Sequence, residues 1–116
     1  MTDFPTINRS AVILLPTKAC LEWVKSCPDF VSDLPLGKMQ REPTVYLIPE
    51  AKMAPEDYIR RHYKPMFEEE LNSWYTDPSM WPKDLSFERF KKFFTIHVTT
   101  MVYDLGKGQI EKDDEE

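Results

Sequence analysis

The stretch PEDYIRRHYKPMFEEELNSWYTDPSMWP, residues 55–82, decides the fold of this chain of 116 residues. Its apolar and aromatic residues recur every three to four positions, which is the spacing of one stripe on an amphipathic helix. Pro65 interrupts the pattern, because a proline inside a helix removes a backbone hydrogen bond and clashes with the preceding turn. We therefore expect a kinked helix, or two short helices that meet near Lys64, followed by a corner rich in Trp and Tyr. Such a stripe can cover one face of a sheet.

Three other segments have the composition of short β-strands. Residues 11–15 (AVILL) form a continuous apolar run, which is typical of a central strand that is buried on both faces. Residues 44–48 and 95–103 are rich in β-branched and aromatic residues and predict the other two strands. A helix over residues 18–27, with Thr17 as its N-cap, separates the first two strands. A right-handed crossover of this kind predicts that these two strands run parallel.

The rest of the chain completes the expected topology. Ser86 predicts the N-cap of a further helix over residues 87–94, and residues 28–43 are long enough to predict a helical turn or a short edge strand. Two antiparallel helices between the second and third strands predict that these strands run antiparallel to each other. The sequence thus predicts an α+β fold (β-α-β-α-α-β) with a small mixed three-stranded sheet, ordered 2-1-3, and helices mainly on one face.

Length and charge indicate a single domain with an acidic end. Residues 111–116 contain five acids and one lysine, and so carry −4 of the formal charge of −5. We expect one α+β domain over residues 1–110 and a disordered acidic tail over residues 111–116. The nearly neutral body lacks the clustered Lys and Arg that phosphate contacts need, which disfavours nucleic acid as a partner.

The two cysteines and the N-terminal residues bear on location and cofactors. Cys20 and Cys27 would lie about 10 Å apart along one helix, which is beyond the reach of a disulfide. Both are interpreted as buried small residues, with Cys20 the better of two poor candidates for a nucleophile. Neither a signal peptide nor a long apolar stretch is recognisable, which predicts a cytoplasmic protein without membrane contact. No metal-ligand spacing or phosphate loop is present, so neither a metal nor another cofactor is expected.

No catalytic motif is recognisable, and two hypotheses about function stay open. The first is an accessory or interaction domain that binds another protein through an aromatic helical surface formed by Trp74, Tyr75 and Trp81, with Asp77 beside them. The second is a small enzyme or metabolite-binding protein with a pocket between sheet and helices.

His97, Tyr103 and Asp104 would lie at the mouth of that pocket, and His97 would be the general base if the chain is an enzyme. Glu68, Glu69 and Glu70 are consecutive, so their side chains point about 100° apart along a helix and do not line one site. We interpret these three residues as solvated surface.

The strings PTVYLIPE (43–50) and EELNSWYTDPSMWP (69–82) resemble those of a group of small uncharacterised bacterial proteins. The resemblance extends over roughly residues 11–105 and implies a bacterial, cytosolic, stand-alone domain. Pro65 and Ala54 depart from the more helix-friendly pattern of that group. The resemblance implies no activity, partner or site residue, so both hypotheses stand beside it.

Overall fold

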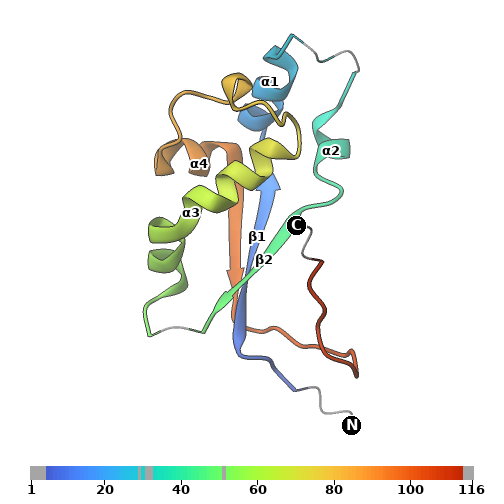
Figure 1. Cartoon of the computed structure of the whole chain (residues 1–116), viewed down its shortest axis with the longest axis vertical. Coiled ribbons are helices and arrows are strands. Elements are labelled where there is room, and N and C mark those ends of the chain that lie inside the picture. The colour runs from blue at the N-terminus through green and yellow to red at the C-terminus, as the bar shows by residue number, and fades with distance from the viewer. Residues whose placement is uncertain (1–4, 29, 31–32, 51, 114–116) are drawn as a thin grey trace.

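A computed structural model, which describes residues 5–28, 30, 33–50 and 52–113, places helices against one face of a three-stranded sheet (Figure 1). The elements in chain order are β1 (Arg9–Pro16), α1 (Lys18–Ser26), α2 (Leu36–Met39), β2 (Thr44–Pro49), α3 (Pro55–Asn72), the 3-10 helix η1 (Pro78–Met80), α4 (Phe87–Phe93) and β3 (Phe94–Thr99). The predicted α+β class, with helices mainly on one face, is confirmed. The helix α2 also confirms the expected turn within residues 28–43.

The strand order 2-1-3 is confirmed, but the predicted parallel pairing of the first two strands is wrong. β1 pairs with β2 antiparallel, and the first residue of β2, Thr44, lies opposite Leu14 near the end of β1. The connection contains α2 as well as α1, so the chain leaves β1 and returns to the same end of the sheet. The connection is therefore not a crossover, and the sheet is antiparallel rather than mixed.

β2 and β3 run in the same direction, whereas the sequence predicted opposite directions. Each is antiparallel to β1, and Phe94, the first residue of β3, lies opposite Pro16. The reason is the unequal length of the helices between them. α3 has 18 residues and carries the chain back along the sheet, while α4 has only seven and continues into β3 without returning it (Figure 1).

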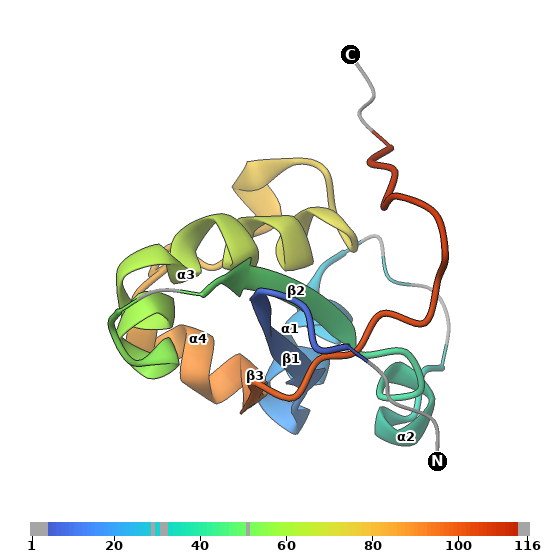
Figure 2. The ribbon, with the colours of Figure 1, turned by 90° about the horizontal axis from the view of Figure 1, so that it is seen from below.

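α3 continues through Pro65 as one helix, so two separate helices do not form. Its first turns and its C-terminal turns point in different directions (Figures 1 and 2). Both Pro65 and Arg61, whose carbonyl would otherwise accept from position 65, are exposed. Water can therefore satisfy the freed carbonyl, which lowers the cost of a proline at this position.

The core lies between the helices and the face of the sheet that they cover. Phe67 of α3 is fully buried, and its ring centre lies 5.4 Å from Phe90, 5.6 Å from Phe93 and 6.1 Å from Phe94. These rings join α3, α4 and β3 in one cluster. Val12 and Leu14 of β1 are fully buried in the same core, which fixes the covered face of the central strand.

The predicted starts of the helices at residues 18 and 87 are correct, but only one of the two predicted cap contacts forms. The Ser86 hydroxyl accepts from the Arg89 N–H at 3.2 Å, as predicted for the N-cap of α4. Thr17 occupies the N-cap position of α1, yet its hydroxyl donates to the carbonyl of Lys92. Thr17 therefore ties α1 to the end of α4.

The strand predicted over residues 95–103 is shorter: β3 ends at Thr99, and Tyr103 lies in an isolated bridge with Thr6. Residues 111–113 of the predicted tail have no regular structure, and residues 114–116 lie outside the described part of the chain.

Candidate functional site

Most of the predicted aromatic corner belongs to the interior. The Tyr75 hydroxyl donates to the carbonyl of Val24 at 2.8 Å, and Trp81 Nε1 donates to the carbonyl of Tyr75 at 2.8 Å. Trp23 of α1 packs edge-on against Tyr75 with ring centres 5.5 Å apart, and its Nε1 donates to the carbonyl of Met80 at 3.0 Å. The polar tips of these rings are thus used within the chain, where they fasten α1 to the segment after α3.

Trp74 and Asp77, the other two residues of that predicted surface, are exposed but do not line a common cavity. Trp74 is 39% exposed and, with Glu70, lines a cavity of about 200 Å³ that neither Tyr75 nor Asp77 lines. Asp77 caps η1 through Oδ1, which accepts from the Ser79 N–H at 3.0 Å, and this hydrogen bonding lowers the pKa of Asp77. Of the three aromatic residues, Trp74 is exposed and Tyr75 and Trp81 are half-buried, and a role in partner binding stays a prediction.

His97, Tyr103 and Asp104 do not line the cavity that lies between α3, α4 and β3. His97 is exposed and alternates with Ile96 and Val98, which face the helices, so it lies on the opposite face of the sheet. Tyr103 is 44% exposed in the segment after β3, and Asp104 accepts from a backbone N–H two residues further on. The cavity between sheet and helices is therefore built from other residues.

Glu70 is the side chain that the sequence pattern assigned incorrectly. Its carboxylate is half-buried and accepts two hydrogen bonds from β2, from the Thr44 hydroxyl at 3.0 Å and from the Tyr46 hydroxyl at 2.6 Å. Burial, with a further contribution from Glu70, raises the pKa of Tyr46, so the phenol stays protonated as a donor. Glu70 follows the buried residues Met66 and Phe67 by four and three positions, a spacing that places it beside the apolar stripe.

Cys20 lies near this carboxylate and is held as a neutral thiol. Burial, and secondarily the charge of Glu70, raises the pKa of Cys20 from 9.0 to about 12. Cys20 and Cys27 are both free, at 2% and 7% exposure, which confirms their interpretation as buried small residues. Because the thiolate is the nucleophilic form, Cys20 lacks the character of a catalytic residue at neutral pH.

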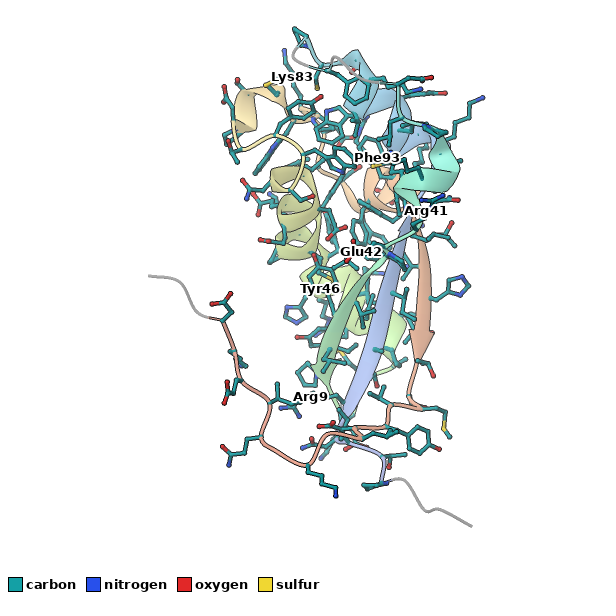
Figure 3. All side chains as sticks on the ribbon, turned by 90° about the vertical axis from the view of Figure 1, so that its right-hand side faces the viewer. Arg9, Arg41, Glu42, Tyr46, Lys83 and Phe93 are labelled. Atoms are coloured by element: carbon teal, nitrogen blue, oxygen red, sulfur yellow. The ribbon has the colours of Figure 1, made fainter. Side chains whose placement is uncertain are left out.

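The face of the sheet turned away from the helices is open, with α3 behind the strands (Figure 3). Strand alternation and the pairing register assign to it Arg9, Ala11, Ile13 and Leu15 of β1, Val45, Leu47 and Pro49 of β2, and Thr95, His97 and Thr99 of β3. We call this set the uncovered face. None of these residues is Asp or Glu, although the chain has 20 acids. The part of the uncovered face that β1 and β2 form is mainly apolar, and the part that β3 forms is polar.

Exposed apolar residues gather on this face and on the segment that follows β3. Val45 and Leu47 are 53% and 46% exposed. The segment adds Met101, Tyr103, Leu105 and Ile110, at 44% to 65% exposure. Ile110 and Leu47 line a common cavity of about 400 Å³, so the segment adjoins the uncovered face along β2. Sequence reasoning missed this surface, although the apolar run over residues 11–15 had predicted burial on both faces.

A second feature is a cavity of about 310 Å³ between α3, α4 and β3, floored by Ile59, Ile96 and Val98. At its rim the Arg60 guanidinium carbon and the Lys91 Nζ each lie 5.0 Å from the ring centre of Phe87. This distance is within the range of cation–π attraction. The ion pairs in the described part of the chain, Lys25–Asp33 and Arg89–Asp84, use neither cation.

Comparisons of the chain with protein-family models, curated proteins and solved structures give no match. The resemblance to a bacterial group therefore stays a prediction. Among the described residues, no helix has both the length and the apolar character needed to cross a membrane. Within the same residues, no three His, Cys, Asp or Glu side chains form a group that could hold a metal ion.

Proposed function

We propose that this chain is a protein-interaction domain that docks its partner through the uncovered face and the adjoining segment after β3. The observation that carries the proposal is the apolar character of the open side of β1 and β2. An antiparallel sheet with one solvated face commonly has polar residues at the outward positions. Here Ile13, Val45 and Leu47 occupy those positions, with Val45 and Leu47 about half exposed. Extended apolar patches of this kind mark interaction surfaces in soluble proteins.

The contacts of the aromatic corner favour the sheet, rather than that corner, as the docking surface. A partner that bound Tyr75 and Trp81 through their polar tips would compete with hydrogen bonds that these side chains already make to the chain itself. Burying a polar group without its partner costs about 1–3 kcal/mol. The uncovered face has no such internal contacts to give up at Val45 and Leu47, whose side chains are purely apolar.

Affinity capture with matched variants tests which surface binds. The bait carries Val45→Lys with Leu47→Lys, and the control bait carries Trp74→Ala, which removes the exposed ring on the helical side. We expect the unchanged chain and the Trp74→Ala bait to retain a partner at a fixed stoichiometry, either a different protein or a differently tagged copy. The double variant should lose it. Retention by the double variant and loss with Trp74→Ala would instead favour the aromatic surface.

A second candidate function is binding of a small anion with an apolar body, in the cavity between α3, α4 and β3. Arg60 and Lys91 outnumber the single acid, Glu56, in the lining of the cavity, and its floor of Ile59, Ile96 and Val98 is apolar. Sites for small ligands typically combine an apolar lining with a few polar groups that fix orientation. The ligand class that fits is a carboxylate attached to an apolar group, and binding alone is proposed.

A thermal-shift series of aliphatic and aromatic carboxylates tests this second candidate. We expect a rise in melting temperature that Arg60→Gln or Lys91→Gln reduces and that His97→Ala leaves unchanged, since His97 lies on the other face of the sheet. A shift that disappears with His97→Ala and survives both cavity variants would contradict the assignment. The absence of any shift across the series would remove the candidate.

A further inference from the structure

A cavity of about 200 Å³ lies on the helix-covered side of the sheet, where the C-terminal end of α3 meets α2 and the end of β1. The buried side chains of Leu14, Met39 and Phe94 form its apolar floor, and Trp74, at 39% exposure, lines its side. Leu14 belongs to the core, so this cavity is separate from the uncovered face. Its volume is below the range of about 300–1,000 Å³ that drug-sized ligands occupy, so a ligand that fits it is small.

The charged side chains that line this cavity are both carboxylates, Glu42 and Glu70. No Lys, Arg or His lines it, and the cations nearest to Glu42 along the chain, Lys38 and Arg41, are exposed. In the described part of the chain, the ion pairs involve neither carboxylate. The negative charge of the cavity is therefore not balanced by an ion pair within these residues.

The Glu70 carboxylate is fixed in position but keeps free capacity to accept hydrogen bonds. The Thr44 hydroxyl donates to its Oε1 at 3.0 Å and the Tyr46 hydroxyl donates to its Oε2 at 2.6 Å. Each carboxylate oxygen has two lone pairs, so one lone pair on each oxygen remains. A ligand can therefore donate to Glu70 without displacing either hydroxyl.

The hydroxyl groups of the lining also present acceptors rather than donors. The Thr44 hydroxyl uses its proton on the Glu70 carboxylate, and the Ser73 hydroxyl donates to the Glu70 carbonyl at 2.7 Å. What remains to a ligand at both hydroxyl oxygens is their capacity to accept. The Trp74 Nε1–H is the remaining side-chain donor in the lining. The cavity thus favours a ligand that donates hydrogen bonds.

Two further features favour a positive charge in this cavity. The C-terminal end of a helix carries a partial negative charge, which cations stabilise. The cavity adjoins this end of α3, a helix of 18 residues that has no basic residue in its last turn. The indole ring of Trp74 can also attract a cation that lies over its face.

We infer that this cavity binds a primary alkylammonium ion. The ammonium N–H groups donate to Glu70, the Trp74 ring packs against the cation, and the carbon chain covers the apolar floor. Glu42, labelled in Figure 3 where the chain passes from α2 into β2, adds negative charge at the exposed edge of the cavity. This inference does not depend on the proposed function, because the cavity and the uncovered face lie on opposite sides of the sheet.

A metal ion fits this cavity less well than an ammonium ion. Calcium takes about six to eight oxygen ligands, whereas the lining provides two carboxylates, one of which already accepts two hydroxyl protons. Among the described residues, no three His, Cys, Asp or Glu side chains are grouped so as to hold a metal. The apolar floor also has no use in binding a bare ion, whereas it suits a carbon chain.

Isothermal titration calorimetry of the full chain with n-butylammonium chloride tests the inference. Two matched ligands separate the contributions: n-butanol has the same carbon chain without the charge, and tetramethylammonium has the charge without an N–H group. We expect n-butylammonium to bind at least about tenfold more tightly than either, because hydrogen bonds to a charged group are strong. Equal binding of n-butanol or tetramethylammonium, or an equal response to calcium chloride, would overturn the inference.

Single variants locate the site. Glu70→Gln should raise the dissociation constant of n-butylammonium about tenfold to 100-fold, and Trp74→Ala should raise it about threefold or more. The matched control is Glu68→Gln, which changes the net charge equally at a position about 200° around α3 that does not line the cavity. The control should leave the dissociation constant within about twofold of that of the unchanged chain. Equal weakening by Glu68→Gln would show general attraction to an acidic chain and would overturn the site.

Circular dichroism checks that each variant folds. Trp74→Ala and Glu42→Gln alter exposed side chains, so they keep the test decisive even if Glu70→Gln disturbs β2. Comparison of n-butylammonium with Nα-acetyl-lysine methylamide then distinguishes a free amine from a lysine side chain as the source of the ammonium group. If neither compound binds, the inference fails, while the capture experiment on Val45 and Leu47 still decides the proposed function.

Discussion

Leu14 and Ile13 are consecutive residues of β1, with side chains of the same composition, and they lie on opposite faces of one sheet. Leu14 is fully buried in the helix-covered core, whereas Ile13 lies on the uncovered face between Val45 and His97 and is only half-buried. In the described part of the chain, the helices pack on the face that carries Leu14. The comparison shows that the apolar composition of a strand can exceed what its own chain is able to bury.

The largest expected change in stability comes from replacing Leu14 and Ile13, one at a time, by alanine. Leu14→Ala should lower the free energy of unfolding by about 2–5 kcal/mol, because it leaves a cavity in a close-packed core. Ile13→Ala should cost less than about 1 kcal/mol, because the Ile13 side chain is only half-buried. Urea unfolding gives both values. Equal costs would show that Ile13 is packed as closely as Leu14.

The aromatic corner provides the next contrast. Trp81→Ala should lower the free energy of unfolding by about 2–3 kcal/mol, because it removes a half-buried ring and a hydrogen bond to the Tyr75 carbonyl. Trp74→Ala should cost less than about 1 kcal/mol, since that ring is 39% exposed. Thermal and urea unfolding compare the two. A larger cost for Trp74 would indicate that it, and not Trp81, holds the corner together.

The next effect depends on pH and concerns Cys20, which lies in the core between the helices and the sheet. The pKa of the Cys20 thiol is raised from 9.0 to about 12 in the folded chain. Above pH 9 the unfolded chain releases this proton while the folded chain keeps it, so the stability from Cys20 falls as the pH rises towards 12. The loss is about 1.4 kcal/mol per pH unit in this range.

Urea unfolding of the unchanged chain and of Cys20→Ala, across the alkaline range, isolates this contribution. The variant should lose stability less steeply with pH, whatever its offset at neutral pH. Parallel slopes for the two proteins would show that the thiol titrates alike in the folded and unfolded chains.

The smallest expected effect is at the Tyr46–Glu70 contact. Tyr46→Phe removes the hydroxyl that donates to Glu70 at 2.6 Å and should cost about 1–2 kcal/mol. The matched control is Tyr58→Phe, since Tyr58 is also half-buried and its ring lies tilted against His62, with ring centres 4.3 Å apart. We expect the control to change the free energy of unfolding by less than about 0.5 kcal/mol. If the two variants differ in their free energy of unfolding by less than about 0.5 kcal/mol, the position of β2 does not depend on the contact between Tyr46 and Glu70.

The elements of the fold were predictable because they follow from local patterns. The apolar stripe of α3, the proline boundaries of β2 and the Ser86 cap of α4 are all read from neighbouring residues. The direction of β2 was not predictable from local patterns, since it depends on the number and the length of the helices that connect the strands. The additional helix α2 and the shortness of α4 give β2 the opposite direction from the predicted one, relative to both β1 and β3.

The candidate site was predictable only in part. The sequence drew attention to Trp74, Tyr75 and Trp81, but it does not reveal that two of these rings use their polar tips on the backbone of the chain. The sequence also does not reveal the role of Glu70. Three consecutive acids cannot be told apart until the packing of α3 against β2 shows which of them contacts Thr44 and Tyr46. Each of these outcomes depends on contacts between residues far apart in the chain.

The sequence by itself determined the α+β class, the strand order and a central strand that is apolar on both sides, because side-chain periodicity and backbone preferences act over a few residues. Only the tertiary structure decided which of those sides the helices cover. That choice follows from the docking of Phe67, Phe90 and Phe93 on the face that carries Val12 and Leu14. Once this core is closed, Val45 and Leu47 are left at the surface.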